Sequence, residues 1–548
     1  MSKKKKMAET DNNEQQRTGT LRRWLKPSIL IPGGLLIVAF AVFAHFYLKI
    51  RHGLFDDTFI YLHIAKNGAE SGTWQYFPIV DRPALLASSP LKIVLLTIAA
   101  YFAQILGFGA RTFYHAKLIL VLYAPLPLFL FLPFWPKRKL GTFLFVGAIY
   151  FFLACCLNTI VDFEGGLFMF WMISLLLLLQ ELRSKSSGDV PASQYLPWSM
   201  EKSAKLRFSW ILPLGGMIRP DLALPVYLAL LVLLPFEAWK ELFPTIIKAG
   251  LTIGIGWCLL CFVMDVWPIP VTYWTKVSMP KLFEQAFMLE VLPLRLGRIT
   301  VAAATNKTAV ILGSIFLLFP LLIYPNWRGR QRIAVGLAIL TGIFLTARAP
   351  ANFWWYYQNL WMLIFSVLLG CLLRETSWGL KNAAWYPSWI FVLFMIGTLA
   401  WGRYQIDDPE IWKVGAESRA QGYMYLGAHA IGDGRYRIPG LGEVFIKNPE
   451  LGMTSYFSGK GAWIWDSAGL AQPMDHPKVR QSPLRYFYPR CLWKSAREDA
   501  EWLARKAGVK LHVEEVWAME DRNFEVARKK ARFVSEEGAI VSNTFIRE

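Results

Sequence analysis

The sequence has few charged residues for its length. They make up 18% of the 548 positions, against 55% hydrophobic and 15% aromatic residues. A soluble enzyme has no core large enough to bury so many apolar side chains, whereas a chain that crosses a bilayer repeatedly exposes them to lipid. The scarcity of charge argues against a soluble protein and predicts an α-helical polytopic membrane protein.

Acidic residues are the scarcer charged type, 39 against 59 Lys and Arg, which gives a formal net charge of +20. The basic excess lies in the N-terminal tail and in the loops between apolar runs, whereas residues 402–548 are nearly neutral. This distribution is typical of the bias of Lys and Arg toward cytoplasmic loops, not of a nucleic-acid-binding surface. We therefore expect no nucleic-acid partner.

The sequence also lacks the motifs of thiol and nucleotide sites. Of its six cysteines, Cys258 and Cys261 have CxxC spacing, but they lie in the apolar stretch "WCLLCF" without the polar neighbours of a metal or redox pair. No Walker loop and no GxGxxG after a predicted strand is present. We expect neither a cysteine-based site nor a nucleotide-binding domain.

Apolar runs of membrane length dominate residues 28–401. The first, 28–50, follows the basic tail and is longer than the core of a signal peptide, so we expect a signal anchor with a cytoplasmic N-terminus. The run 90–106 is interpreted as a helix at the outer interface, because counting it as a span would put later basic loops outside. The predicted spans, about eleven in all, are 28–50, 112–135, 140–158, 165–182, 208–219, 222–238, 246–266, 302–323, 333–347, 358–373 and 386–401.

This topology divides the chain into three parts. Residues 1–27 form a basic cytoplasmic tail, and residues 28–401 form the transmembrane domain, with a first outer loop at 51–111. Residues 402–548 are less apolar and richer in turns, with the strand-like "EVFI" and a helix-like stretch at 495–508. We expect them to form a soluble α/β domain on the outer, periplasmic face.

Polar residues outside the predicted cytoplasmic loops gather on the outer face. Each has a simpler interpretation: Asp57 would cap a helix starting at Thr58, Lys276 would extend its amine to the surface, and the aromatic residues 353–357 would form an interfacial belt. Their convergence on one side favours a site. The candidates are Asp56, Asp57, His63, Glu164, Arg219, Asp221, Thr272, Lys276 and Arg348.

Carboxylates and cations on several loops suit one kind of chemistry. A carboxylate deprotonates a hydroxyl or binds a divalent cation, and basic side chains stabilise a phosphate leaving group. Because the outer face has no nucleotide-sugar pool, a transferase there would need a donor delivered in the membrane. A polyprenyl-phosphate sugar meets this need, with its lipid tail held among apolar helices.

The stretches "DDTFIYLHIAKNGAESGTWQY" and "ASSPLKIVLL" resemble the opening loop of GT-C-type membrane glycosyltransferases, above all the mycobacterial terminal β-arabinofuranosyltransferases and their bacterial relatives. Four later stretches are similar to further elements of that family, in the same order. They are "DFEGGLF", "GMIRPDLALP", "WPIPVTYWTKVS" and "PELGMTSYFSGKGAWIWDSAGLAQP". Together these elements cover nearly the whole chain.

The resemblance implies a GT-C fold in a bacterial inner membrane, a polyprenyl-phosphate donor and inversion at the anomeric carbon. Asp56 or Asp57 would be the catalytic base, or both would bind a divalent cation (Mg, Mn or Ca). Glu164 would support the acceptor site, while Arg219 and Lys276 would face the donor phosphate. His63 stands where the family usually has Arg, and Val271 where it has Asn, so the donor sugar and acceptor stay open.

Two other classes of function remain. A polyprenyl-linked glycan transporter or flippase would also need cations near a lipid phosphate, but we find no internal repeat of the kind many transporters show. A non-catalytic envelope-assembly protein would work through residues 402–548. The acceptor of a transferase would be a polysaccharide, a lipid-linked glycan or a protein.

Overall fold

The computed structural model describes the first part of the membrane domain and much of the C-terminal region. The described residues are 27–49, 56–107, 112–135, 139–156, 161, 164–183, 202–271, 333–338, 340–341, 427–438, 442–448, 451–466, 471–472, 474, 486, 488–508 and 540–542. The predicted spans 302–323, 358–373 and 386–401, and most of 333–347, lie outside these residues.

Three helical stretches among the described residues are long and apolar enough to cross a membrane, which takes about 20 residues. They support a helical membrane protein, while the count of about eleven spans stays a prediction. The stretches are Pro27–Leu48 in α2 (Pro27–Lys49), Phe113–Phe134 in α5 (Phe113–Tyr123), α6 (Leu126–Phe131) and η2 (Leu132–Phe134), and Phe236–Val263, which is α12.

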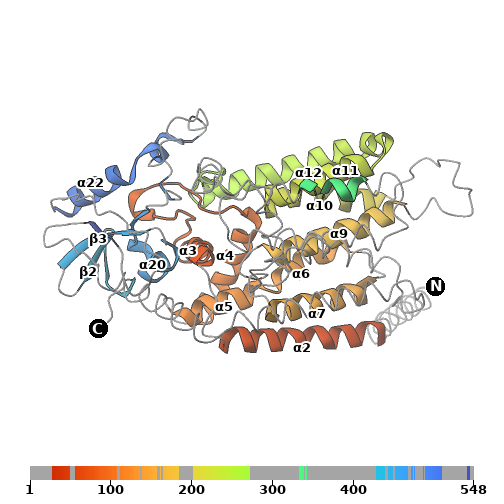
Figure 1. Cartoon of the computed structure of the whole chain (residues 1–548), viewed down its shortest axis with the longest axis horizontal. Helices are drawn as coiled ribbons and strands as arrows, with labels where there is room; N and C mark the ends of the chain where they lie inside the picture. Colours follow the sequence, from red (N-terminus) through yellow and green to blue (C-terminus); the bar gives the residue numbers. More distant parts are fainter. Residues whose placement is uncertain are drawn as a thin grey trace, which may run out of the picture.

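Four shorter apolar helices accompany these stretches: α7 (Leu140–Cys156), α9 (Gly165–Arg183), α10 (Lys202–Ile218) and α11 (Pro220–Leu233). Figure 1 shows α2, α7, α9 and α12 running along the long axis of the molecule. The predicted cytoplasmic loop at 239–243 differs from the structure, because these residues belong to the first turns of α12. Trp, Lys, Glu and Leu all fit a helix interior, so the helix continues through the basic segment.

The first helix packs closely against α7. Gly141 permits this approach, since a Cβ at that position would clash with the main-chain carbonyl of Ser28. One turn and a half further along, Gly147 makes room for Leu36 of α2 and Leu128 of α6. Glycines thus occur where the backbones of neighbouring helices come closest.

Two helices of the predicted first outer loop, α3 (Asp56–Ser71) and α4 (Pro90–Ile105), pack against each other. The α4 helix has a buried side and an exposed apolar side. With 16 residues it is shorter than a typical span, as are α7 and α11 in the predicted spans 140–158 and 222–238, so the exclusion of 90–106 stays a prediction. An exposed apolar stripe suits a membrane interface, and this location stays a prediction. The stripe consists of Ile98, Tyr101, Phe102 and Ile105.

The C-terminal region folds around a small mixed sheet. Strand β3 (Gly442–Asn448) is at its centre, antiparallel to β2 and parallel to both β4 and β5. The helix α22 (Ala496–Ala507) begins at a capping box formed by Ser495 and Glu498 and ends at Gly508, whose φ of 70° suits glycine. The other strands are β1 (Ala430–Gly432), β2 (Arg435–Ile438), β4 (Ile464–Asp466) and β5 (Ile540–Ser542).

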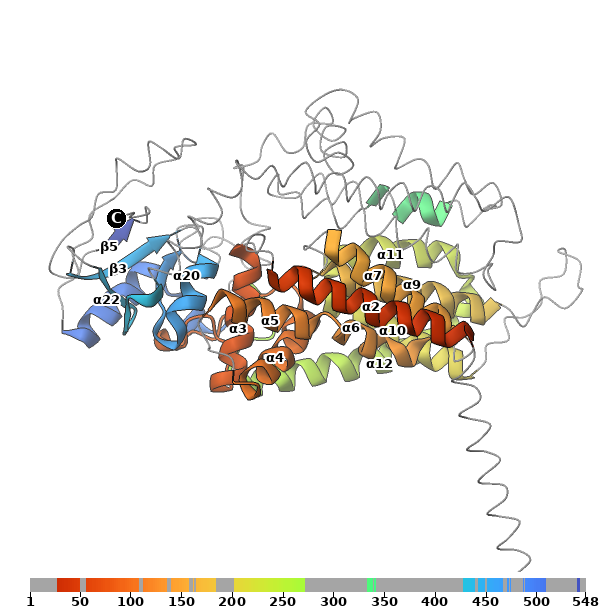
Figure 2. The same cartoon turned by 90° about the horizontal axis from the view of Figure 1, so that it is seen from below.

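This region lies at one end of the molecule, next to α3, in both views (Figures 1 and 2). Its short helix α20 (Leu451–Ser458) packs directly against α3. The expected strand at "EVFI" and the expected helix at 495–508 are present as β3 and α22. Its periplasmic location stays a prediction.

Candidate functional site

The site begins at the first turn of α3. The helix starts at Asp56, so Asp57 lies inside it and is not the cap of a helix starting at Thr58. Asp57 precedes Tyr61 by four residues, which puts the two backbone positions on the same side of the helix. The side chains of Asp56 and Asp57 are outside the described part of the structure.

Glu164 is the centre of a buried polar cluster. Its side chain is 1% exposed, and it accepts a hydrogen bond of 2.6 Å from the hydroxyl of Tyr61. Its other carboxylate oxygen pairs with Nη1 of Arg219 at 3.3 Å. The residue stands just before α9, where its carbonyl accepts the amide of Phe168 at 2.9 Å. The predicted candidates Glu164 and Arg219 are therefore brought together.

Local backbone structure holds Arg219 in place. It is the single extended residue between α10 and α11, with φ of −169° and ψ of 114°. Pro220 at the first position of α11 favours this break, because a residue before proline avoids the helical conformation. Its side chain is 9% exposed. The turn between α10 and α11 thus places the guanidinium group of Arg219 next to Glu164.

Lys92 adds a second cation. It is fully buried in the first turn of α4, and its Nζ lies 4.4 Å from the centre of the Tyr61 ring. A buried ammonium group needs nearby anions or π-electrons, and the N-terminus of a helix does not favour a cation. The buried charge of Lys92 is therefore stabilised by Tyr61 and Glu164, and not by its place in the first turn of α4.

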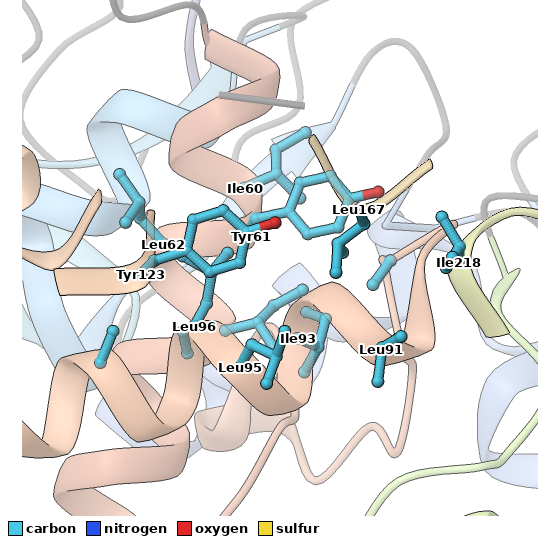
Figure 3. Close-up of a cluster of buried hydrophobic side chains, with 14 of the residues drawn as sticks. Ile60, Tyr61, Leu62, Leu91, Ile93, Leu95, Leu96, Tyr123, Leu167 and Ile218 are labelled. Atoms are coloured by element: carbon cyan, nitrogen blue, oxygen red, sulfur yellow. The ribbon is translucent and has the colours of Figure 1, made fainter. Parts of the chain in front are cut away.

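Tyr61 joins the parts of the cluster. Besides its bond to Glu164, the hydroxyl of Tyr61 lies 2.8 Å from Oγ of Ser88. Figure 3 shows Tyr61 on α3 together with Leu91 and Ile93 of α4, among the apolar side chains that enclose the cluster. Ser89, buried before α4, has no hydrogen-bond partner for its hydroxyl within the described structure.

Electrostatics keep Glu164 ionised. Burial alone would raise the pKa of Glu164, but the charges of Arg219 and Lys92 and the Tyr61 hydrogen bond outweigh burial and hold the pKa below its usual value. The cluster thus contains two cations and one carboxylate. This arrangement has the sign of charge that attracts a phosphate.

His63 belongs to a different side of α3. It is fully buried, with Nε2 3.0 Å from the carbonyl oxygen of Tyr76 and 3.3 Å from Nδ2 of Asn67. Burial, reinforced by the charge of Lys66, lowers the pKa of His63 to about 3, so the ring is neutral at physiological pH. The structure therefore places His63 against Tyr76 and not beside Glu164.

The remaining candidates are not described at side-chain level. Thr272, Lys276 and Arg348 lie outside the described residues, as does the side chain of Asp221 in the first turn of α11. The chain that leads to Thr272 and Lys276 passes the cluster, since the amide of Val271 donates to the carbonyl of Leu85 at 3.0 Å. Leu85 is three residues before Ser88.

Among the described residues, no group of three or more His, Cys, Asp and Glu side chains is placed to bind a metal. The binding of a divalent cation by Asp56 and Asp57 stays a prediction. Sequence reasoning did not identify Tyr61, Ser88 and Lys92 as site residues. A single lysine in the otherwise uncharged run at 90–106 was the signal for Lys92.

The buried cluster, with two cations and one carboxylate, has a charge that suits an anion next to the start of α3. Its residues come from α3, the segment before α4, the first turn of α4, the segment before α9 and the α10–α11 turn. The resemblance to GT-C-type glycosyltransferases rests on the sequence stretches alone. Comparisons of the chain with family models, with curated proteins and with solved structures found no match.

Proposed function

We propose that this protein is a membrane glycosyltransferase that uses a polyprenyl-phosphate sugar as donor. It transfers the sugar, of which arabinofuranose is the nearest candidate, to a hydroxyl group of a cell-envelope acceptor on the periplasmic face of the inner membrane. The observation that supports this most is the pair of buried cations, Lys92 and Arg219, around the single carboxylate of Glu164.

The reaction is a single displacement. The acceptor oxygen attacks the anomeric carbon, a new glycosidic bond forms, and the bond from that carbon to the phosphate oxygen breaks. The bonding electrons leave with polyprenyl phosphate, and the hydroxyl proton goes to Asp56 or Asp57. Displacement from the opposite face inverts the anomeric carbon.

In this proposal the cations act on the leaving group. Lys92 and Arg219 stabilise the negative charge that grows on the phosphate as the bond breaks. Glu164 orients Arg219 and accepts from Tyr61, so that these side chains are fixed before the donor binds. Asp57 and Tyr61 share one side of α3, which supports a base close to the donor phosphate.

An apolar groove supports the proposal that the donor has a polyprenyl tail. A cavity of about 490 Å³ lies between α10, α11 and α12 and has almost no polar lining. The helices α10 and α11 meet at Arg219, and the groove residues Pro213 and Tyr227 lie about 9 and 12 Å along them from that turn. A phosphate at Arg219 would thus have room for isoprene units in the groove. The lining includes Leu212, Pro213, Tyr227, Leu230, Trp239 and Ile246.

The test uses the purified full-length protein with polyprenyl-phosphate sugars and measures the release of polyprenyl phosphate in the presence of acceptor glycans. Release that depends on both donor and acceptor supports the proposal. Binding of donor without release, together with its movement between leaflets of vesicles, would favour a transporter. No release with any donor from a folded protein contradicts the proposed activity.

A further inference from the structure

The helix α3, which contains Asp56 and Asp57, lies between the Glu164 cluster on one side and α20 with the Tyr76 segment on the other. Asp57 and Tyr61 lie on the side of α3 that faces the Glu164 cluster. Phe59, His63 and Lys66, spaced four and three residues apart, lie on the opposite side. That second side packs against α20 and the Tyr76 segment.

The α20 helix is unusually buried for a short helix. All of its residues, Leu451–Ser458, are buried. The rings of Tyr456 and Phe457 contact Phe59 with centroid distances of 5.3 and 5.6 Å. Because Phe59 is in the first turn of α3, these rings fix the part of the helix where the two aspartates lie.

Tyr456 also makes polar contacts to α3. The Nζ of Lys66 donates to the main-chain oxygen of Tyr456 at 3.3 Å and lies 4.8 Å from the centre of its ring. Lys66 is 2% exposed and Tyr456 is fully buried. Contacts between a buried ammonium group, a carbonyl oxygen and a ring are costly to break, since the charge would lose its partners.

The same tyrosine reaches a membrane helix. Its hydroxyl lies 2.8 Å from Nδ1 of His115 in the first turn of α5, which opens a candidate span. A second link joins the hydroxyl of Tyr76 to the carbonyl of Leu451 at 3.1 Å. Tyr456 is therefore the point at which α3, α5 and the C-terminal region meet.

We propose that Tyr456 is a positioning residue: the C-terminal region, through Tyr456, fixes α3 relative to α5 and so sets the position of the catalytic aspartates. This inference rests on the proposed glycosyltransferase function and assigns a role to the "GMTSYFSGKG" stretch, which the reaction itself does not use. Misplacement of a catalytic group by about 1 Å lowers turnover by about a hundredfold in known enzymes.

The test compares full-length Tyr456→Leu and Tyr456→Phe with Tyr436→Leu. Tyr436 is the matched control: it is a fully buried tyrosine of β2 whose hydroxyl lies 3.0 Å from Ser458 Oγ. Hydrogen exchange of the α3 amides and the steady-state constants are measured for each. Lys66→Met is a second variant, in case Tyr456→Leu does not fold.

For Tyr456→Leu and Lys66→Met we expect exchange in α3 to rise about tenfold and kcat to fall at least about tenfold, with the donor KM within about twofold. Tyr456→Phe keeps the ring contacts, so its α3 exchange should rise less and its kcat should fall less than in Tyr456→Leu. Tyr436→Leu should leave α3 exchange and kcat near wild type. Unchanged α3 exchange, or raised exchange with unchanged kcat, overturns the positioning role. If the wild type releases no polyprenyl phosphate, the proposed function fails, while exchange of the α3 amides still tests whether Tyr456 fixes that helix.

Discussion

The hydroxyl of Tyr61 donates a hydrogen bond of 2.6 Å to the carboxylate of Glu164, although the two residues are 103 positions apart. This bond ties α3 to the start of α9 and puts the side of α3 that contains Asp57 next to Arg219 and Lys92.

Glu164→Gln should destabilise the protein strongly. The substitution leaves the guanidinium of Arg219 and the ammonium of Lys92 buried without their anion, and removing one partner of a buried pair costs about 3–5 kcal/mol. Chemical denaturation in detergent, followed by helical signal, measures the change.

Glu181→Gln, in the last turn of α9, is the control. Glu181 pairs with Arg207 at 2.7 Å, but the two side chains are 19% and 24% exposed. A pair with this much solvent contact is worth about 0–1 kcal/mol. Equal losses of unfolding free energy in Glu164→Gln and Glu181→Gln would show that the buried cluster stabilises the protein no more than a partly exposed ion pair does.

Lys92→Met should leave the fold intact and weaken donor binding. Methionine keeps much of the side chain's apolar length and removes a buried charge, while Glu164 and Arg219 remain as a pair. If Lys92 contacts the donor phosphate, the donor KM should rise by about tenfold or more, the range for a charged hydrogen bond of about 1.5–3 kcal/mol. Donor titration of polyprenyl phosphate release gives KM and kcat.

Lys117→Met provides a matched control. Lys117 is also a buried lysine, 4% exposed, with its Nζ 5.3 Å from the ring centre of Phe113 in α5. Its removal should leave the donor KM within about twofold of wild type. A similar rise in KM for both variants would mean that the effect comes from loss of any buried lysine and not from contact with the donor.

The long apolar elements could be predicted from sequence, whereas the cluster could not. The run 28–50 is present as the helix α2, and the run 90–106 as the helix α4, because their apolar runs determine them locally. The amphipathic pattern and the cap at Ser495 likewise mark α22. The predicted break between the spans 222–238 and 246–266 was wrong at 239–243, since Lys240, Glu241 and Leu242 are good helix formers and α12 continues through them.

Contacts between distant segments limited the prediction of the site. Glu164 and Arg219 were chosen from separate motifs and do pair, but the role of Tyr61 depends on how α3 turns toward α9. His63 was expected beside the donor, yet a residue two positions from Tyr61 points about 160° away from it on a helix. Sequence alone did not show which side of α3 faces the cluster.

Stability should fall as the pH drops from 7 to 5 because of His63. Its folded pKa, about 3, is below the unfolded value near 6.5, so the unfolded chain binds the proton first. The stabilisation is complete above pH 6.5 and is lost progressively toward pH 3, with a slope of at most about 1.4 kcal/mol per pH unit. Denaturation at several pH values between 5 and 7.5 avoids the range where Glu164 titrates.

His63→Gln should remove the part of this slope that comes from His63, because glutamine takes up no proton in that range. Lys66→Met removes the charge that assists burial in lowering the pKa of His63, so the loss of stability should end at a higher pH, while the slope between pH 5 and 7.5 stays close to that of the wild type. A wild-type slope that persists in His63→Gln would assign the pH dependence to another group.

Substitution of Asp56 and Asp57 should identify the base. Loss of a general base lowers kcat by about 10²–10⁴ with little change in donor KM, so one of Asp56→Asn and Asp57→Asn should show that loss and the other a smaller one. The position of Asp57 on the Tyr61 side of α3 favours Asp57. Equal losses, restored in part by added Mg, Mn or Ca, would instead indicate two ligands of one cation.

Asp81→Asn controls for the loss of an acidic residue from the same outer loop. Asp81 is exposed and has φ of 48°, a conformation that Asn adopts as readily as Asp, so the change removes charge without straining the backbone. It should leave kcat within about twofold of wild type. Normal kcat in Asp56→Asn, Asp57→Asn and the double variant would contradict base catalysis by these two residues, because the acceptor proton would then have to go to another group.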